Sequence, residues 1–371
     1  MNTAKVIISE HPIPYPKNGS WSQRMEYFLE SDYNCIDYYI CGKTNGTLKS
    51  KTTFYRVNQY KSKFISKFFK GYRYKEYTKS IRDLLLKHDH LIICVVDNVK
   101  LKIAINSYLE KNNALNKVTL IFYNCGYSYY LDDTTNATFL KNCSEMIFLT
   151  ENAYLYNKQK YIEFTPEVTI INNPVNKQKF FSIPKLEKES LLKENQLHNK
   201  IVYLWLSHDR KKKGLNIVLN AWKDWNKSPD EAQLLVVGAK RSEKINGVQF
   251  IGQVPSDLVD KYYKMAHVYL FPTLCKEGFG LSLAQAMCCG CFSIAANNGG
   301  VSDFFNSENG ILIDSPNIVA NWVKSFNDSF ELMNQNYQGQ SFENQILSND
   351  EWCQKFAKVF DKWEQRFKGK T

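Results

Sequence analysis

The sequence predicts an α/β protein built from two successive doubly wound domains, each a parallel sheet covered by helices on both faces. Three observations predict this fold. Short apolar runs alternate with amphipathic stretches, glycine-containing turns follow several of the runs, and the pattern restarts near the middle of the chain. With 371 residues, 44% of them hydrophobic and 23% charged, the chain is long enough for two ordinary cores.

In the first half, apolar and β-rich runs indicate buried strands. They are residues 5–8, 91–96, 118–123, 146–150 and 168–171. The loop after the first run contains Asn18-Gly19-Ser20 and leads into a helical pattern through Met25 and Leu29. A glycine-containing turn after the first strand is a usual phosphate site in α/β domains, so Gly19 and Ser20 are candidate ligands of a phosphate.

Residues 172–199 mark the boundary between the two predicted domains. Asn172-Asn173-Pro174-Val175-Asn176 breaks the strand pattern, and a polar, Lys- and Glu-rich helical linker follows. We therefore assign residues 1–175 to the first domain and residues 176–345 to the second. The strand pattern then restarts with runs at residues 201–206, 233–238, 248–254, 267–271 and 291–295.

A strand-to-helix turn in the second half is the strongest candidate for a binding site. Glu277-Gly278-Phe279-Gly280 lies between a short strand and a helical face that begins near Gly278 and that Gly290 ends. Free amides and the helix dipole would face a ligand here, so the turn predicts an anion site beside a carboxylate. Gln285, two turns on, would lie ~12 Å away at ~1.5 Å per residue, which suits the two ends of a sugar nucleotide. An ordinary glycine-rich helix entry is the alternative.

Four consecutive cations, Arg210 to Lys213, follow the first strand of the second half and open a helix after Gly214. Side chains of like charge would repel one another at this place unless an anion binds between them. The loop is therefore a candidate diphosphate site. A solvated loop without a ligand is the alternative.

The stretch 272–300 resembles the donor-site signature of the family-4 retaining glycosyltransferases, which belong to group 1 and have the GT-B architecture. The resemblance is carried by Pro-Thr-x-x-x-Glu-Gly-Phe-Gly-Leu, then Ala-x-Ala-Met, a glycine, an apolar strand and Asn298-Gly299-Gly300. In that family two glutamates separated by seven residues bracket the nucleotide sugar. The matching positions here are Glu277 and Gln285, so the second position departs from the family pattern.

The resemblance implies two Rossmann-like domains facing across a cleft, with a C-terminal helix, residues 346–371, that crosses back to the first domain. It implies that a hexosyl group moves with retention from a nucleoside-diphosphate sugar to a glycan or lipid-linked acceptor, in bacterial surface polysaccharide synthesis (lipopolysaccharide, O-antigen or capsule). We expect no cofactor and no metal, because no Asp-x-Asp ends a strand and the cationic loop can neutralise the leaving diphosphate. At Ser20, Cys125 and Gln285 the chain departs from the family's sequence pattern. One alternative is therefore a non-catalytic sugar-nucleotide-binding subunit of a glycosylation complex.

The resemblance also assigns roles to individual residues. The catalytic candidates are Glu277, near the donor sugar, with Arg210 and Lys213 on the diphosphate. Family members commonly carry a histidine near positions 124–125, where this chain has Asn and Cys, so Cys125 and His11 are the candidates on the acceptor side. For His11 the alternative is a loop histidine without a function. The donor-binding candidates are Gly19, Ser20, Gly214, Gly278, Phe279, Gly280, Leu281 and Gln285.

A net charge of +11 points to anionic partners. Cations and aromatic residues mix most densely in residues 60–86, which indicates either amphipathic helices with a solvated face or a helix on an anionic membrane surface through residues 60–79. Nucleic acid is not an expected partner, because no recognition motif accompanies the charge. Cys288, Cys289 and Cys291 lack a second pair of metal ligands. Without an export signal or a run of ~20 apolar residues, we expect a cytoplasmic protein with reduced thiols. If residues 60–79 bind an anionic membrane, the protein would be peripheral on the inner face of the cell membrane.

Overall fold

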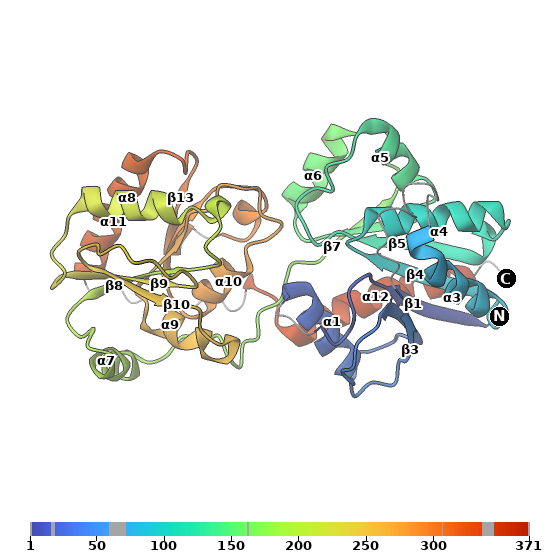
Figure 1. Cartoon of the computed structure of the whole chain (residues 1–371), viewed down its shortest axis with the longest axis horizontal. Helices are drawn as coiled ribbons and strands as arrows, with labels where there is room; N and C mark the ends of the chain where they lie inside the picture. The colour runs from blue at the N-terminus through green and yellow to red at the C-terminus, as the bar shows by residue number, and fades with distance from the viewer. Residues whose placement is uncertain are drawn as a thin grey trace. The chain divides into compact units, whose positions relative to one another are not determined.

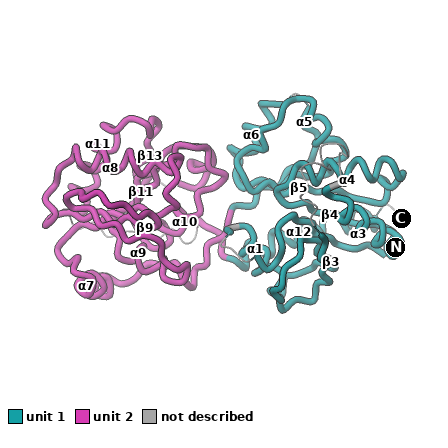
Figure 2. The backbone as a smooth tube through the Cα atoms, viewed as in Figure 1, with its two compact units in different colours: residues 1–172, 349–371 teal, residues 173–348 magenta. Residues whose placement is uncertain are grey.

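The computed structural model describes residues 2–15, 19–58, 72–161, 163–305, 307–335 and 345–369. The chain forms two compact units, residues 1–172 with 349–371 and residues 173–348 (Figure 2). The boundaries assigned from the sequence were residues 175–176 and 345–346. Figure 1 shows that each unit is a layered α/β structure with helices on a central sheet.

Unit 1 contains a parallel sheet whose seven described strands follow the order β3-β2-β1-β4-β5-β6-β7. The strands are β1 (Thr3–Ile8), β2 (Tyr38–Gly42), β3 (Thr53–Val57), β4 (His90–Val96), β5 (Val118–Tyr123), β6 (Glu145–Phe148) and β7 (Glu167–Ile170). The central strand β4 is buried along its whole length, as a strand covered on both faces must be. The order reverses between β1 and β4, and ligands of such sheets bind at the carboxyl ends of the strands at this point.

Two strands of this sheet, β2 and β3, were missed by the sequence analysis. β3 lies at the edge of the sheet, is mostly half-buried and carries Arg56, so it does not form a continuous apolar run. β2 pairs with β1 from Val6 opposite Tyr38 to Ile8 opposite Ile40. A short edge strand such as β3 carries a weak sequence signal because only part of its surface is buried. β2 lies between β1 and β3 and is mostly buried, but its run of five residues is short.

The described helices of unit 1 cover both faces of its sheet (Figure 1). They are α1 (Ser20–Glu30), α3 (Lys75–Leu85), α4 (Val99–Lys111), α5 (Asp133–Leu140), α6 (Glu151–Lys160) and α12 (Asn349–Lys368). Helices α3, α4, α5 and α6 share one apolar core with the sheet. Asn98, Asp132 and Thr150 each accept a hydrogen bond from a first-turn amide of the helix that follows, which fixes where α4, α5 and α6 begin.

The C-terminal helix α12 packs on the other face of the unit 1 sheet, together with α1. The ring of Phe356 lies 5.1 Å from that of Phe28 on α1 and 5.6 Å from that of Tyr123 on β5. Lys5 of β1 forms an ion pair of 2.7 Å with Asp361 of α12. The predicted return of the C-terminal helix to the first domain is therefore confirmed.

Unit 2 contains a second parallel sheet, whose six described strands follow the order β10-β9-β8-β11-β12-β13. The strands are β8 (Ile201–Leu206), β9 (Ala232–Val237), β10 (Val248–Gly252), β11 (Val268–Phe271), β12 (Phe292–Ala296) and β13 (Gly310–Ile313). The order reverses between β8 and β11, so the carboxyl ends of these two strands are the expected ligand-binding place. Two doubly wound α/β units confirm the predicted fold class.

The described helices of unit 2 are α7 (Lys185–Glu194), α8 (Leu215–Trp225), α9 (Val259–Met265), α10 (Leu281–Cys288) and α11 (Val319–Asn334). Figure 1 shows α8 and α11 on one face of the sheet and α9 on the other. Under α8 and α11 the core is aromatic, with Trp222 and Trp225 packed edge-on against Tyr203 of β8. This core fixes β8, and with it the loop that follows β8 at the carboxyl edge.

Candidate functional site

The candidate site is built from two loops that follow β8 and β11, the strands on either side of the reversal in strand order. The loop after β8 carries Arg210 and Lys213, and the loop after β11 carries Glu277. Parallel strands present their carboxyl ends at one edge, so these two loops meet there. Two hydrogen bonds fix the first loop: Leu274 N–H donates to the Lys212 carbonyl at 2.8 Å, and Trp205 Nε1–H donates to the Lys213 carbonyl at 3.2 Å.

Gly214 lets the two loops approach closely. Its φ is +70°, and a Cβ at this position would lie 1.9 Å from the backbone oxygen of Pro272. No side chain can occupy that space, so this position requires glycine. The predicted Lys213-Gly214 pair therefore has a structural reason: the glycine brings Lys213 to the second loop.

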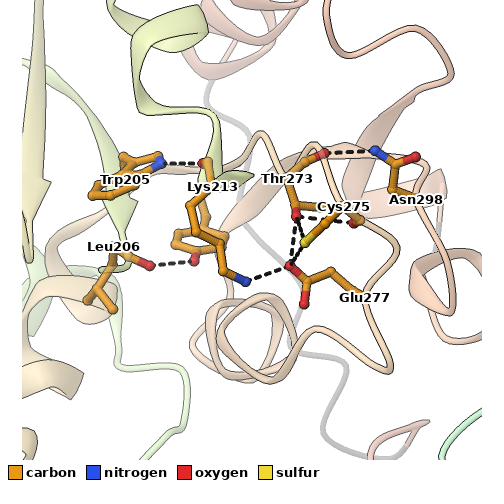
Figure 3. A network of polar contacts seen from close by, with 8 residues as sticks. Trp205, Leu206, Lys213, Thr273, Cys275, Glu277 and Asn298 are labelled. Atoms are coloured by element: carbon orange, nitrogen blue, oxygen red, sulfur yellow. Dashed lines mark hydrogen bonds and ion pairs between the residues drawn. The ribbon is translucent and has the colours of Figure 1, made fainter. Parts of the chain in front are cut away.

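Glu277 is the centre of the polar network drawn in Figure 3. Its Oε1 accepts hydrogen bonds from Thr273 Oγ1 at 2.7 Å and Cys275 Sγ at 3.6 Å, and lies 2.6 Å from Lys213 Nζ. The Glu277 and Lys213 side chains are 16% and 24% exposed, so the ion pair is partly shielded from water. Oε2 makes no hydrogen bond within the described part of the chain, so one carboxylate oxygen can still accept from a ligand.

The backbone of Glu277 is held by the segment 298–300 that the sequence motif contains. Glu277 N–H donates to the Asn298 carbonyl at 3.3 Å, and Gly300 N–H donates to the Glu277 carbonyl at 2.9 Å. Gly299 has φ +76°, and a Cβ there would lie 2.4 Å from the Glu277 carbonyl oxygen. Asn298 also donates from Nδ2 to the Thr273 carbonyl at 2.8 Å (Figure 3). The motif Asn-Gly-Gly therefore holds the backbone of Glu277 in place.

The predicted donor-binding residues 278–281 lead into α10. Gly280 has φ +104° and supplies no side-chain cap, so the first-turn amides of α10, beginning at Leu281, can donate to an anion. The helix begins at Leu281, not near Gly278 as expected, because Gly280 is in the left-handed conformation. Phe279 is 2% exposed and stacks on Phe304 at 4.2 Å, so only its backbone can face a ligand.

Gln285 lies one turn into α10 and is half-buried. Its Oε1 accepts a hydrogen bond from the hydroxyl of Tyr263 on α9, at 3.4 Å. The Tyr263 ring is fully buried and lies 5.4 Å from the Tyr269 ring of β11. Sequence reasoning missed Tyr263, because no local pattern links it to a glutamine that follows it by 22 residues.

Arg210 is exposed and forms no side-chain hydrogen bond or ion pair with the described residues, so its guanidinium can reach a ligand. Its neighbour Asp209 is held by Arg241, which contacts both carboxylate oxygens at 2.9 and 3.2 Å. Arg241 follows β9, the next strand in the sheet, and was missed by the sequence analysis. The available signal was a cation three residues after Gly238, at a strand end.

In unit 1, Gly19 and Ser20 lie at the start of α1. Gly19 is the residue before the helix, its φ is −147°, and it supplies no side-chain cap. The Gly19 carbonyl accepts from Gln23 N–H at 3.1 Å and from Ser22 Oγ at 2.9 Å. The first-turn amides of α1 receive no side-chain cap from Gly19, so they can donate to an anion. That this turn binds a phosphate stays a prediction.

The acceptor-side candidates His11 and Cys125 lie around Asp97, which follows β4 and which sequence reasoning missed. Asp97 has φ +49°, an uncommon conformation for a residue with a side chain, and its Oδ1 accepts from Cys125 N–H at 3.0 Å. Burial raises the pKa of Asp97, against the opposing effects of Cys125 N–H, Arg24 and His11. Arg24 Nη2 lies 3.9 Å from Cys125 Sγ. Burial also raises the pKa of Cys125, so this residue is a thiol at neutral pH.

The basic and aromatic segment 60–79 falls largely outside the described residues, which resume at residue 72. Of its described aromatic side chains, Tyr74 and Tyr77 are buried in the unit 1 core. Within the ranges the structure describes, no helix is both long and apolar enough to cross a membrane. The same ranges contain no group of three or more His, Cys, Asp or Glu side chains arranged to hold a metal ion.

Residues 187–334 match the family model described as glycosyl transferases group 1. The chain therefore resembles the group 1 glycosyltransferases over most of unit 2. It is 24% identical over 272 residues to an uncharacterized glycosyltransferase of Methanocaldococcus jannaschii, a match that covers 69% of this chain and 67% of the relative.

Solved structures with the GT-B fold are similar to the whole chain. Sucrose-phosphate synthase from Thermosynechococcus elongatus is similar with a TM-score of 0.73 at 14% identity, over 99% of this chain and 100% of that chain. The Anabaena protein HepE, in complex with UDP-glucose, is similar with a TM-score of 0.64 at 12% identity, over 97% of this chain and 100% of that chain.

Proposed function

We propose that this protein moves a hexosyl group from a nucleoside-diphosphate sugar, with retention of the anomeric configuration, to a glycan or lipid-linked acceptor of a bacterial surface polysaccharide. The observation that carries the proposal is the Lys213–Glu277 pair at the point where strand order reverses. In this proposal the cation binds a diphosphate, and the neighbouring carboxylate binds a sugar. The UDP-glucose complex of HepE, a protein of the same fold, supports a donor of this class.

In this proposal Glu277 binds the donor sugar through Oε2. Oε1 is already held by Lys213 and Thr273, which fixes the orientation of the carboxylate before a ligand arrives. Oε2 can then accept a hydrogen bond from a sugar hydroxyl. The negative charge also favours the positive charge that develops on the sugar ring as the leaving group departs.

The diphosphate is assigned to Arg210, Lys213, Gly214 and the first turn of α10. These groups supply positive charge and N–H donors to the leaving phosphate, the role that a metal ion would otherwise have, so we propose a metal-independent reaction. The departing phosphate oxygen can accept the proton of the acceptor hydroxyl, so transfer with retention needs no strong protein base. The acceptor side is assigned to His11 and Cys125 in unit 1, with Asp97 between them.

Turnover of a nucleotide sugar by the purified protein tests the proposal. We would incubate it with UDP-, GDP- and ADP-hexoses and an acceptor mixture, with and without a chelator, and follow release of the nucleoside diphosphate. We expect one donor to turn over at a rate that the chelator leaves unchanged. NMR of the first product should show the anomer of the donor, whereas the opposite anomer would contradict retention. Binding of a donor without turnover in any mixture would favour a non-catalytic sugar-nucleotide-binding subunit.

Removing the loop cations should weaken binding of a nucleoside diphosphate far more than binding of the nucleoside. Arg210→Ala and Lys213→Ala each remove a charge-assisted hydrogen bond worth ~1.5–3 kcal/mol, which corresponds to a loss of ~10- to 150-fold in affinity. Calorimetry with UDP and with uridine measures the difference. Lys211→Ala is the matched control, since Lys211 is exposed in the same loop and has no assigned role. Equal losses for UDP and uridine would contradict the assignment of the loop.

A second carboxylate at position 285 should strengthen donor binding. A carboxylate accepts both hydroxyls of a ribose, whereas the amide of Gln285 has one acceptor oxygen, and Tyr263 already donates to it. We expect Gln285→Glu to retain kcat and to lower the donor KM by up to ~10-fold, equivalent to ~1.4 kcal/mol. Steady-state kinetics at varied donor concentration measures both constants. An unchanged KM would place the ribose away from α10.

A further inference from the structure

A cavity of about 420 Å³ lies in unit 2 at the amino-terminal edge of its sheet. Ile201 begins β8, His267 immediately precedes β11 and Gly290 precedes β12, and all three line the cavity. The candidate donor loops follow the other ends of β8 and β11. Because β8 has six residues, the two edges are separated by ~20 Å at ~3.3 Å per residue. The cavity is therefore distinct from the donor site proposed above.

Two lysines from different helices give the cavity a cationic end. Lys188 of α7 donates from Nζ to the Ala266 carbonyl at 2.5 Å. Lys264 of α9 lies 2.9 Å from Asp260 and is 16% exposed. The Lys188 side chain is half-buried, and burial lowers the pKa of its ammonium group. An anion in the cavity would offset the cost of enclosing this charge.

His267 adds a neutral donor to the same end of the cavity. Its Nδ1 accepts a hydrogen bond from Val202 N–H at 3.0 Å, so the ring hydrogen lies on Nε2. Burial, with a smaller effect of the Lys188 charge, lowers the pKa of His267 to about 3. At neutral pH the ring is therefore an N–H donor, and Nε2 meets no acceptor within the described residues.

The first turn of α7 also lines the cavity. Pro184 precedes this ten-residue helix and supplies no side-chain cap, so the positive end of the helix and its first amides favour an anion. Lys185 is a third cation that lines the cavity. Glu189 is the one carboxylate among the described lining residues, and it pairs with Lys185 at 4.0 Å on the exposed side. The residues that line the cavity therefore carry a net positive charge, and Asp260, which pairs with Lys264 from outside the lining, offsets part of it.

The remaining wall is largely apolar. It is formed by Ile183, Leu192, Ile201 and Met333. A matching ligand needs an anionic group with several acceptor oxygens for the cationic end and an apolar body for this wall. The volume of the cavity is typical of sites for small organic molecules. We infer that the cavity binds a small organic phosphate, whose phosphoryl oxygens accept from Lys188, Lys264 and His267 Nε2–H while its apolar body lies against this wall.

Calorimetry with phenyl phosphate, phenol and inorganic phosphate tests the inference. Saturating UDP is present in every titration, so that the proposed donor site is occupied. We expect phenyl phosphate to bind at least ~10-fold more tightly than inorganic phosphate, because phosphate lacks the apolar body. We expect phenol to show no binding, because it lacks the anionic group. Lys188→Met and Lys264→Met should each weaken phenyl phosphate by ~10-fold or more. Lys193→Met, an exposed position on the same helix, should leave the affinity unchanged.

A chemical probe locates the site in the native protein, without any substitution that could disturb folding. The amine of Lys188 attacks the aldehyde carbon of pyridoxal 5′-phosphate, water leaves, and hydride from added borohydride reduces the imine to a stable secondary amine. Peptide mapping should show Lys188 labelled ahead of Lys193 and protected by phenyl phosphate.

Three results would each overturn the inference: no binding of phenyl phosphate with UDP present, an equal loss in Lys193→Met, or labelling of Lys188 that phenyl phosphate does not reduce. None of them depends on turnover of a donor, so they leave the proposed glycosyl transfer untouched.

Discussion

Glu277→Gln is expected to lower kcat for transfer by ~100-fold or more while changing the donor KM by less than ~3-fold. The substitution keeps the size of the side chain and an oxygen that can accept from Thr273. It removes the negative charge that favours the reacting sugar and leaves Lys213 without its ion-pair partner. Because these losses act on charge that develops in the transition state, they should appear in kcat rather than in ground-state binding.

Steady-state kinetics of Glu277→Gln, with the donor identified by turnover, measures the two constants. Glu331→Gln is the matched control, since it makes the same chemical change at an exposed position on α11. A melting temperature equal to that of the wild-type protein shows that the loop is still folded. A Glu277→Gln enzyme with normal kcat would mean that the donor sugar lies away from this carboxylate.

The donor-side turn could be predicted because its signal is local. Glu277-Gly278-Phe279-Gly280 and the helix after it are contiguous, and each residue type has a reason that can be recognised without the fold. The ion pair between Lys213 and Glu277 could not be predicted in this way. It depends on Gly214 packing against Pro272, a contact between loops separated by β9, β10 and β11.

Arg24, Asp97, Arg241 and Tyr263 were missed for a related reason. Each contacts a candidate site residue or its neighbour through tertiary packing, and none belongs to a spaced motif. Asp97 carried one weak signal, its place directly after an apolar run, but its unusual backbone conformation is visible only in the folded structure. Sequence patterns indicate hydrophobic periodicity and the local conformation of the backbone. Which polar side chains contact one another depends on how the sheet brings distant loops together.

The second large effect expected is on α12, where a fully buried carboxylate depends on one lysine. Glu145 of β6 is 0% exposed, and its Oε2 lies 2.7 Å from Lys362 Nζ and accepts from Trp363 Nε1–H at 2.5 Å. Thr169 Oγ1 donates to its other oxygen. Removing the lysine leaves a buried charge without a counter-ion, which typically costs 3–5 kcal/mol in proteins.

We therefore expect Lys362→Met to lower the free energy of local unfolding of α12 by about 3 kcal/mol, near the low end of that range because Trp363 and Thr169 still donate to Glu145. Hydrogen exchange of the α12 amides measures the local unfolding of this helix separately from the rest of the protein. A melting curve of a protein with two units would not separate the two. Lys355→Met, an exposed position on the same helix, is the matched control. Adding Glu145→Gln to Lys362→Met should restore part of the protection, since it removes the buried charge. If the double substitution is no better protected than Lys362→Met, packing of the lysine stem, and not its charge, holds the helix on the sheet.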